Sequence, residues 1–193
     1  MKTENLLQRD GELYYIPDFF SSMESELLFK TIVDETPWRN EPIKIFGKEV
    51  MQPRLTAWFG EKSYTYSGIT MVPYPWTDSL IKIKKQVESF SGDAFNTALL
   101  NLYRDQNDSM GWHRDNEKEL GVNPVIASVS FGETRTFKMK HRELPDLKIS
   151  LEVKNGSLIL MKGSSQHHWL HSVTKTAKEK LPRLNITFRK VWL

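Results

Sequence analysis

The sequence contains no cysteine, which excludes disulfide scaffolds, cysteine-ligated zinc sites and thiol catalysis. No run of apolar residues approaches the roughly 18 that a membrane-spanning helix needs. The first ten residues include four charged side chains and no long apolar core, so we expect no secretory signal. These absences permit a reducing interior, and we expect a location in the cytoplasm of a bacterium or the nucleus of a eukaryote.

The 193 residues are expected to form one domain, residues 1–193, because no linker, repeat or low-complexity run divides them. Six tryptophans and ten phenylalanines exclude a disordered chain. Residues 101–193 carry 16 lysines and arginines against 10 acidic residues, whereas residues 1–100 carry 11 against 14. This basic excess suits a face that meets a polyanion, although a solvated surface explains it equally well.

Two helices are expected in the first half of the chain. The first follows a capping-box pattern, Ser21 to Glu24, and its expected apolar face consists of Leu27, Leu28, Ile32 and Val33. The second begins after Thr77, ends near Gly92 and carries Leu80, Ile83, Val87 and Phe90.

Short β-rich segments dominate the chain from Asn96 onward. They span residues 96–103, 125–131, 134–140, 148–153, 157–161, 168–173 and 183–191. Asn155-Gly156, between two of them, is typical of a two-residue hairpin turn. The order of elements predicts an α+β, mainly β fold: an antiparallel sandwich or a jelly roll (double-stranded β-helix) over about 96–193, with supporting helices within about 1–95.

The last segment alternates strictly between polar and apolar residues. Its polar positions are Arg183, Asn185, Thr187 and Arg189. They could face solvent. They could instead line an anion-binding cavity, because the planar fork of arginine suits a carboxylate.

His113-Arg114-Asp115 places an imidazole and a carboxylate two residues apart, where an extended chain points both side chains the same way. A third ligand could come from His167, His168 or His171. Two histidines and one carboxylate leave positions open on Fe(II) for an oxo acid and O2. A single histidine is more often structural, but the pair, the later histidines and the arginine strand occur together.

Four stretches of this sequence resemble the AlkB-like Fe(II)/2-oxoglutarate dioxygenases. They are Asn101-Leu-Tyr103, His113-Arg-Asp115, His171-Ser-Val173 and Arg183-Leu-Asn-Ile-Thr-Phe-Arg189. Further stretches are most similar to the double-strand DNA repair branch of that family. They are Ile45-Phe-Gly-Lys48, Tyr64-Thr-Tyr-Ser-Gly68, Pro75-Trp76, Ile126–Gly132 and His168-Trp169.

The resemblance implies a role for each matching residue. His113, Asp115 and His171 would hold iron, with His171 chosen because it stands twelve residues before Arg183. Arg183, assisted by Tyr103, would bind the distal carboxylate of 2-oxoglutarate. The carboxylate nearer the metal would meet Asn101 and Arg189, while Asn185 and Thr187 would organise the same wall.

The resemblance also implies the activity, namely oxidative dealkylation of bases such as 1-methyladenine and 3-methylcytosine in DNA, preferably duplex, by a monomer that uses Fe(II), 2-oxoglutarate and O2. The damaged nucleotide would be flipped into the pocket. Residues implied to contact the substrate base or its surroundings are Phe46, Tyr64, Tyr66, Ser67 and Glu117, and phosphate contacts are expected of Arg54, Arg135, Lys175, Lys178 and Lys180.

Phe46 would be a wedge that fills the gap left by the flipped base, and its alternative is a core position on a short strand. Two other functions stay open. One is a 2-oxoglutarate oxygenase that acts on RNA or protein. The other is a jelly roll that binds nucleic acid without catalysis.

Overall fold

A computed structural model describes residues 4–45, 48–61, 64–66 and 69–192, and side chains are described outside residues 43–48 and 62–71. Most elements are strands, which lie in two larger sheets and two small hairpins. The helices are α1 (Ser22–Glu35), α2 (Asp78–Ser91) and α3 (Ser165–His168), besides a short 3₁₀ helix, Lys118–Leu120. No described helix has the length and apolarity required to cross a membrane.

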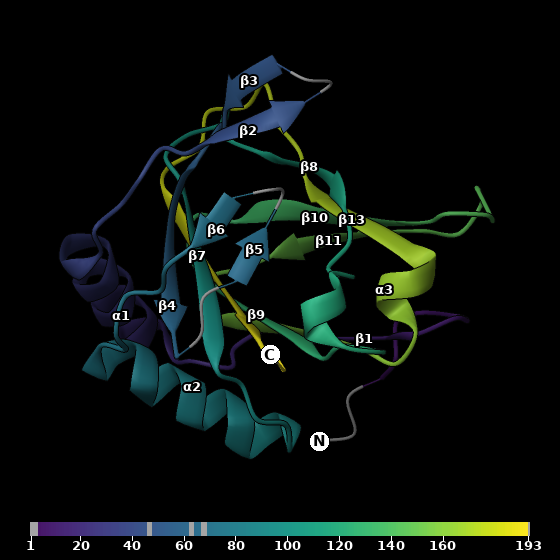
Figure 1. The fold of residues 1–193 in the computed structure, drawn as a ribbon, viewed down its shortest axis with the longest axis horizontal. Coiled ribbons are helices and arrows are strands. Elements are labelled where there is room, and N and C mark those ends of the chain that lie inside the picture. The colour runs from purple at the N-terminus through teal and green to yellow at the C-terminus, as the bar shows by residue number, and fades with distance from the viewer. Residues whose placement is uncertain (1–3, 46–47, 62–63, 67–68, 193) are drawn as a thin grey trace.

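Both larger sheets are antiparallel and face each other as the jelly roll predicted from the sequence (Figure 1). The six-stranded sheet has, in spatial order, β1 (Glu12–Ile16), β12 (Ser157–Lys162), β9 (Ile126–Gly132), β14 (Arg183–Arg189), β7 (Thr97–Tyr103) and β4 (Leu55–Gly60). The four-stranded sheet has β11 (Lys148–Val153), β10 (Arg135–His141), β13 (Trp169–Val173) and β8 (Met110–His113). The hairpins are β2 (Pro42–Ile45) with β3 (Lys48–Met51), and β5 (Tyr64–Tyr66) with β6 (Ile69–Met71).

The two predicted helices form and pack on the outer face of the six-stranded sheet (Figure 1). Ser21 caps α1 through the reciprocal bonds of a capping box with Glu24, and Thr77 accepts the backbone N–H of Leu80 at the start of α2. Gly92 ends α2 in the left-handed conformation, with φ of 74°. The local capping signals were therefore sufficient to place both helices.

The predicted apolar faces of these helices need correction. Leu27 is 65% exposed, because the face of α1 that packs on the sheet is formed by Ser25, Leu28 and Ile32. Ser25 is small enough to lie against Gly156, where an added Cβ would collide with the Ser25 hydroxyl oxygen. In α2, Phe90 is likewise exposed, while Leu80, Ile83 and Val87 are buried.

The Asn155-Gly156 turn does not close a hairpin, contrary to the prediction. The strands on either side of it, β11 and β12, belong to different sheets. Gly156 has φ of 72° and donates its N–H to Ser130, while the Asn155 side chain accepts the N–H of Gly132. The left-handed turn therefore carries the chain across from one sheet to the other, anchored on β9.

The first 95 residues contribute strands to the six-stranded sheet in addition to the supporting helices. β1 and β4, which come from this part of the chain, form the two edges of the six-stranded sheet. A buried cluster between the two sheets includes Leu99, Ile126, Phe137 and Met139, and it leaves β14 in the middle of the larger sheet, facing the smaller one. This placement decides where the functional side chains lie.

Candidate metal and anion site

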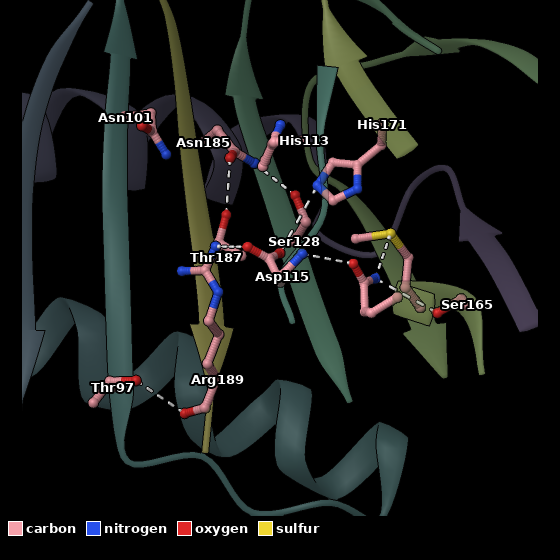
Figure 2. Close-up of polar contacts among 12 residues, drawn as sticks. Thr97, Asn101, His113, Asp115, Ser128, Ser165, His171, Asn185, Thr187 and Arg189 are labelled. Atoms are coloured by element: carbon pink, nitrogen blue, oxygen red, sulfur yellow. Dashed lines mark hydrogen bonds and ion pairs between the residues drawn. The ribbon is translucent and has the colours of Figure 1, made fainter. Parts of the chain in front are cut away.

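The polar row of β14 is buried, so the solvent-facing alternative is wrong for this strand. β14 pairs with β9 on one side and β7 on the other, and Arg183, Asn185, Thr187 and Arg189 all point into a cavity between the sheets. Within the row, Thr187 donates to Asn185 Oδ1 (3.1 Å), and Asn185 donates to Ser128 Oγ (2.7 Å). A hydrogen-bonded polar wall therefore crosses the interior (Figure 2).

The other wall brings together His113, Asp115 and His171 (Figure 2). β8 and β13 pair so that His171 lies opposite His113, with ring centroids 4.1 Å apart. Asp115 follows the end of β8, and its Oδ2 lies 3.8 Å from His171 Nε2. One ligand atom from each residue lies within 4.8 Å of the others, which the sequence spacing alone could not establish.

The charge states of these residues suit a cation. Burial lowers the pKa of His171 to about 3 and also lowers the pKa of His113, so both imidazoles are neutral near pH 7. Burial is the largest single effect on the pKa of Asp115 and acts to raise it, but the guanidinium of Arg189, 2.8 Å from Oδ1, and the imidazoles of His171 and His113 together hold the pKa below its ordinary value. Two neutral nitrogens and one carboxylate are thus available.

An Fe(II) ion fits this donor set. Asp115 Oδ2 is buried and has no hydrogen-bond partner within the described part of the chain, and it lies 3.8 Å from His171 Nε2. His113 Nδ1 lies 2.9 Å from the carbonyl oxygen of Gly111, which orients the ring and leaves Nε2 for a metal. Two imidazoles with one carboxylate are the ligand set of non-haem Fe(II) oxygenases.

Arg183 supplies the anion-binding half of the site. Its side chain is 2% exposed, and Nη2 donates to Ser130 Oγ at 2.8 Å. Nε and Nη1, however, have no hydrogen-bond partner among the described residues. The ring of Tyr103 lies 5.2 Å from the guanidinium carbon. A buried cation with two unused donors is costly unless an anion binds it, so the cavity fits a carboxylate.

Apart from Arg54 and Arg135, the remaining expected residues divide into three groups. Asn101 lines the cavity, and its Oδ1 accepts a 2.7 Å hydrogen bond from Arg54 Nε. Glu117 is partly buried at the start of the 3₁₀ helix, and Lys175 and Lys178 are exposed, whereas Lys180 pairs with Glu133 at 2.8 Å. Phe46 and Ser67 lie outside the described residues, as do the side chains of Tyr64 and Tyr66 on β5.

Two expected phosphate contacts are corrected by the structure. Arg54 and Arg135 are 4% and 1% exposed. Arg54 is bonded to Gln52, Asn101 and the carbonyl of Ser109. Arg135 donates to the backbone carbonyls of Asp105, Asp108 and Thr174. Both guanidiniums organise the interior, because their donors are already used there.

Gln166, on α3, is a positioning residue that the sequence reasoning missed. It is fully buried, and its Oε1 accepts the backbone N–H of Asp115 at 2.9 Å. The bond joins α3 to the segment that carries the central metal ligand. No local pattern marks it, because the two residues are 51 positions apart.

Replacing Gln166 with methionine is expected to weaken Fe(II) binding about 10- to 100-fold, the usual effect of losing an outer-shell partner. Methionine keeps the volume, but its thioether sulfur is only a weak acceptor for the Asp115 N–H. Fe(II) titration of the metal-free protein measures this change in affinity. His168→Ala, on the same helix, is the control and should bind iron as the wild type does. Unchanged iron affinity in Gln166→Met would contradict the positioning role.

Comparison with known proteins agrees with this geometry. Residues 12–189 match the family model described as the 2OG-Fe(II) oxygenase superfamily. The chain is 40% identical over 185 residues to the Bos taurus alpha-ketoglutarate-dependent dioxygenase alkB homolog 3, covering 91% of this chain and 65% of that protein. It is 36% identical over 186 residues to the Homo sapiens DNA oxidative demethylase ALKBH2, covering 90% and 71%. The chain thus spans about two thirds of the length of these relatives.

A solved structure shares the fold. OsALKBH1 superposes with a TM-score of 0.67 over 97% of this chain and 100% of that one, at 16% sequence identity. At that identity the likeness concerns the fold alone, and it agrees with the two facing antiparallel sheets.

Proposed function

This chain belongs to the AlkB-like branch of the 2OG-Fe(II) oxygenase superfamily, and from that membership we propose that it oxidatively demethylates N-alkylated bases in DNA. Iron held by the three ligands, with 2-oxoglutarate and O2, would supply the oxidation that hydroxylates the N-methyl carbon and converts the cosubstrate to succinate and CO2. The hydroxymethyl product then loses formaldehyde and leaves the unmodified base.

One observation carries this proposal: a set of iron ligands and an unsatisfied buried arginine line the same cavity. His113, Asp115 and His171 would hold the metal. Arg183 would bind the distal carboxylate of 2-oxoglutarate, and Arg189, which already orients Asp115, would meet the nearer carboxylate together with Asn101. A binding module without catalysis would need neither set.

The substrate is proposed in more detail from the sequence. The DNA is preferably duplex, and the enzyme acts as a monomer. A flipped base would lie between the ring of His113 and Tyr66, with Glu117 near its exocyclic amino group and Tyr64 and Ser67 shaping the pocket. β2 and β3 pair with Ile45 opposite Lys48, which is the frame that a wedge at Phe46 requires.

The test is direct. The protein is incubated with Fe(II), 2-oxoglutarate, ascorbate and a DNA duplex carrying 1-methyladenine, and the base is followed by mass spectrometry. We expect unmodified adenine and formaldehyde in equal amounts, and neither without 2-oxoglutarate. Single-stranded DNA and RNA of the same sequence, each carrying 1-methyladenine, are assayed in parallel. Repair of RNA alone, or of no nucleic acid, would contradict a DNA repair function.

Replacing Phe46 with alanine is expected to reduce repair of methylated duplex much more than repair of the same single strand. A wedge matters only where a base leaves an intact stack, and the vacancy there costs a few kcal/mol. The two repair rates and the melting temperature are measured together. Equal losses on both substrates with a lower melting temperature would instead identify Phe46 as a core residue.

A further inference from the structure

The inward-facing row of β10 ends in a charged residue that the proposed chemistry does not use. Phe137 and Met139 of this row belong to the apolar cluster between the two sheets. Arg135 occupies the next position of the same row, because alternate residues of a strand share one face, and it is 1% exposed. Arginine is almost never fully buried unless it is paired, so a cation at this position calls for a physical reason.

Three backbone carbonyls hold the Arg135 guanidinium in one place. Nη1 donates to the carbonyl of Asp105 at 3.0 Å, and Nη2 donates to the carbonyls of Asp108 and Thr174 at 2.8 and 2.9 Å. Carbonyl groups satisfy these donors but carry no net charge. The hydrogen bonds therefore fix the position of Arg135 and leave its positive charge in the interior.

The carboxylates near Arg135 compensate this charge only in part. Three of them act to raise its pKa, namely Asp105, Asp108 and Glu133. Burial is the larger effect, and it leaves the pKa of Arg135 below its ordinary value. The Asp108 carboxylate is bound through both oxygens to Arg104, and that of Glu133 lies 2.8 Å from Lys180. In the described part of the chain, no carboxylate forms an ion pair with Arg135 itself.

Arg135 and Arg183 lie against the same aromatic ring. Their guanidinium carbons are 5.6 and 5.2 Å from the centroid of the Tyr103 ring, within the range of a cation–π contact. Tyr103 and Arg183 both line the cavity of the candidate site. Burial lowers the pKa of Arg183, Tyr103 acts in the opposite direction, and the positive charge of Arg135 lowers that pKa again. The two cations therefore repel each other, and an anion bound at Arg183 would be attracted by both.

The cosubstrate, 2-oxoglutarate, has one carboxylate at each end. Under the proposed function its distal carboxylate meets Arg183, beside Tyr103, and the other carboxylate lies near the metal ligands. Resting on the proposed function, we propose that Arg135 is a positioning and specificity residue that holds the Tyr103 ring, adds a second positive charge beside it, and so selects a 2-oxo acid with a distal carboxylate. A 2-oxo acid without that carboxylate would gain little from Arg135.

The test compares the affinities of two ligands. 2-Oxoglutarate and 2-oxopentanoate, which carries a methyl group in place of the distal carboxylate, are titrated by calorimetry into the Fe(II)-loaded protein without O2. Arg135→Gln removes the charge and keeps an amide that can donate to the carbonyls. We expect the ratio of the two affinities to fall about three- to thirtyfold in this variant, because one positive charge acts on the distal carboxylate through the protein interior.

The alternative is that Arg135 only ties together the segments that carry Asp105, Asp108 and Thr174. Both ligands would then weaken equally in Arg135→Gln, and the unchanged ratio would overturn the proposal. Arg135→Lys keeps the charge without the planar guanidinium, and it should retain most of the wild-type ratio. A large fall of the ratio in Arg135→Lys would mean that geometry and not charge matters, and it would overturn the proposal even if Arg135→Gln does not fold.

The matched control is Lys138→Gln on the same strand. Lys138 belongs to the other row of β10, so this variant removes the same charge from the opposite face of the sheet. Its affinity ratio should equal that of the wild type. An equal fall of the ratio in Lys138→Gln and Arg135→Gln would mean that only net charge matters, and the assignment to Arg135 would be wrong.

The same experiment separates this proposal from the proposed function, because it measures binding of the cosubstrate and not demethylation. If the wild type demethylates DNA but the ratio is unchanged in Arg135→Gln, the role of Arg135 is wrong and the proposed function stands. If the ratio falls in Arg135→Gln but the wild type demethylates no DNA, the role of Arg135 stands and the proposed function is wrong.

Discussion

Replacing any one of His113, Asp115 and His171 with alanine is expected to abolish demethylation and to leave the purified protein without iron. Two remaining ligands bind Fe(II) poorly, and the three are the set whose ligand atoms lie within 4.8 Å of one another at the cavity. Iron content by mass spectrometry and turnover of 2-oxoglutarate measure the effect. Iron at the wild-type stoichiometry in any of the three variants would contradict the ligand assignment.

The thermal stabilities of these variants should differ in a way that identifies the partner of Asp115. Asp115→Ala leaves Arg189 buried without the carboxylate that lies 2.8 Å from it, and breaking a buried ion pair costs about 3–5 kcal/mol. His113→Ala removes no such partner, so its melting temperature should fall much less. His168→Ala, which changes a histidine outside the cavity, should keep its iron and serves as the control for both measurements.

Replacing Arg183 with leucine is expected to raise the 2-oxoglutarate requirement about thirtyfold to a few thousandfold while iron binding persists. Loss of one partner from a buried, hydrogen-bonded charge pair costs about 2–5 kcal/mol, and each 1.4 kcal/mol is tenfold in affinity. Leucine cannot replace the guanidinium donors, of which Nε and Nη1 are unused within the described protein. The apparent KM for 2-oxoglutarate and the iron affinity are the two measurements.

The stability of the Arg183→Leu protein adds a sharper criterion. Because Arg183 carries unsatisfied donors in the interior, its removal should not lower the melting temperature of the ligand-free protein. Wild-type protein should gain stability when 2-oxoglutarate binds, and the variant should lose that gain. Arg183→Lys keeps the charge without the planar fork of donors. The stability that it gains on binding 2-oxoglutarate should therefore lie between the gains of the wild type and of Arg183→Leu. An unchanged KM in Arg183→Leu would refute the carboxylate-binding role.

Local sequence patterns were enough for several elements of the fold. The caps at Ser21 and Thr77 placed both helices, because a cap is satisfied by residues two or three positions away. Strict alternation placed β14 with its four polar residues on one face, because the strand period is two. The same period put His113 and Asp115 within reach of one metal ion. Each of these features depends only on residues that are close together in the sequence.

Pairing between distant segments decided the rest. The residues alone left His167, His168 and His171 as candidates, and the pairing of β13 with β8 sets His171 opposite His113. Burial of Arg54 and Arg135 depends on partners that come from other elements. Asn155-Gly156 would form a turn in a hairpin as well as in a connection between sheets. The placement of β11 and β12 in different sheets makes it a connection between sheets.

The sequence by itself therefore determined which residue types repeat at which spacing, and with them the helices, the strand periodicity and the iron-ligand pair at residues 113 and 115. Only the tertiary structure decided which face of each strand is buried and which distant partners meet. Burial is a property of the whole packed chain: β14 is a buried anion wall because β7 and β9 flank it and the second sheet covers it. Gln166 reaches Asp115 for the same reason, across 51 residues that no local period connects.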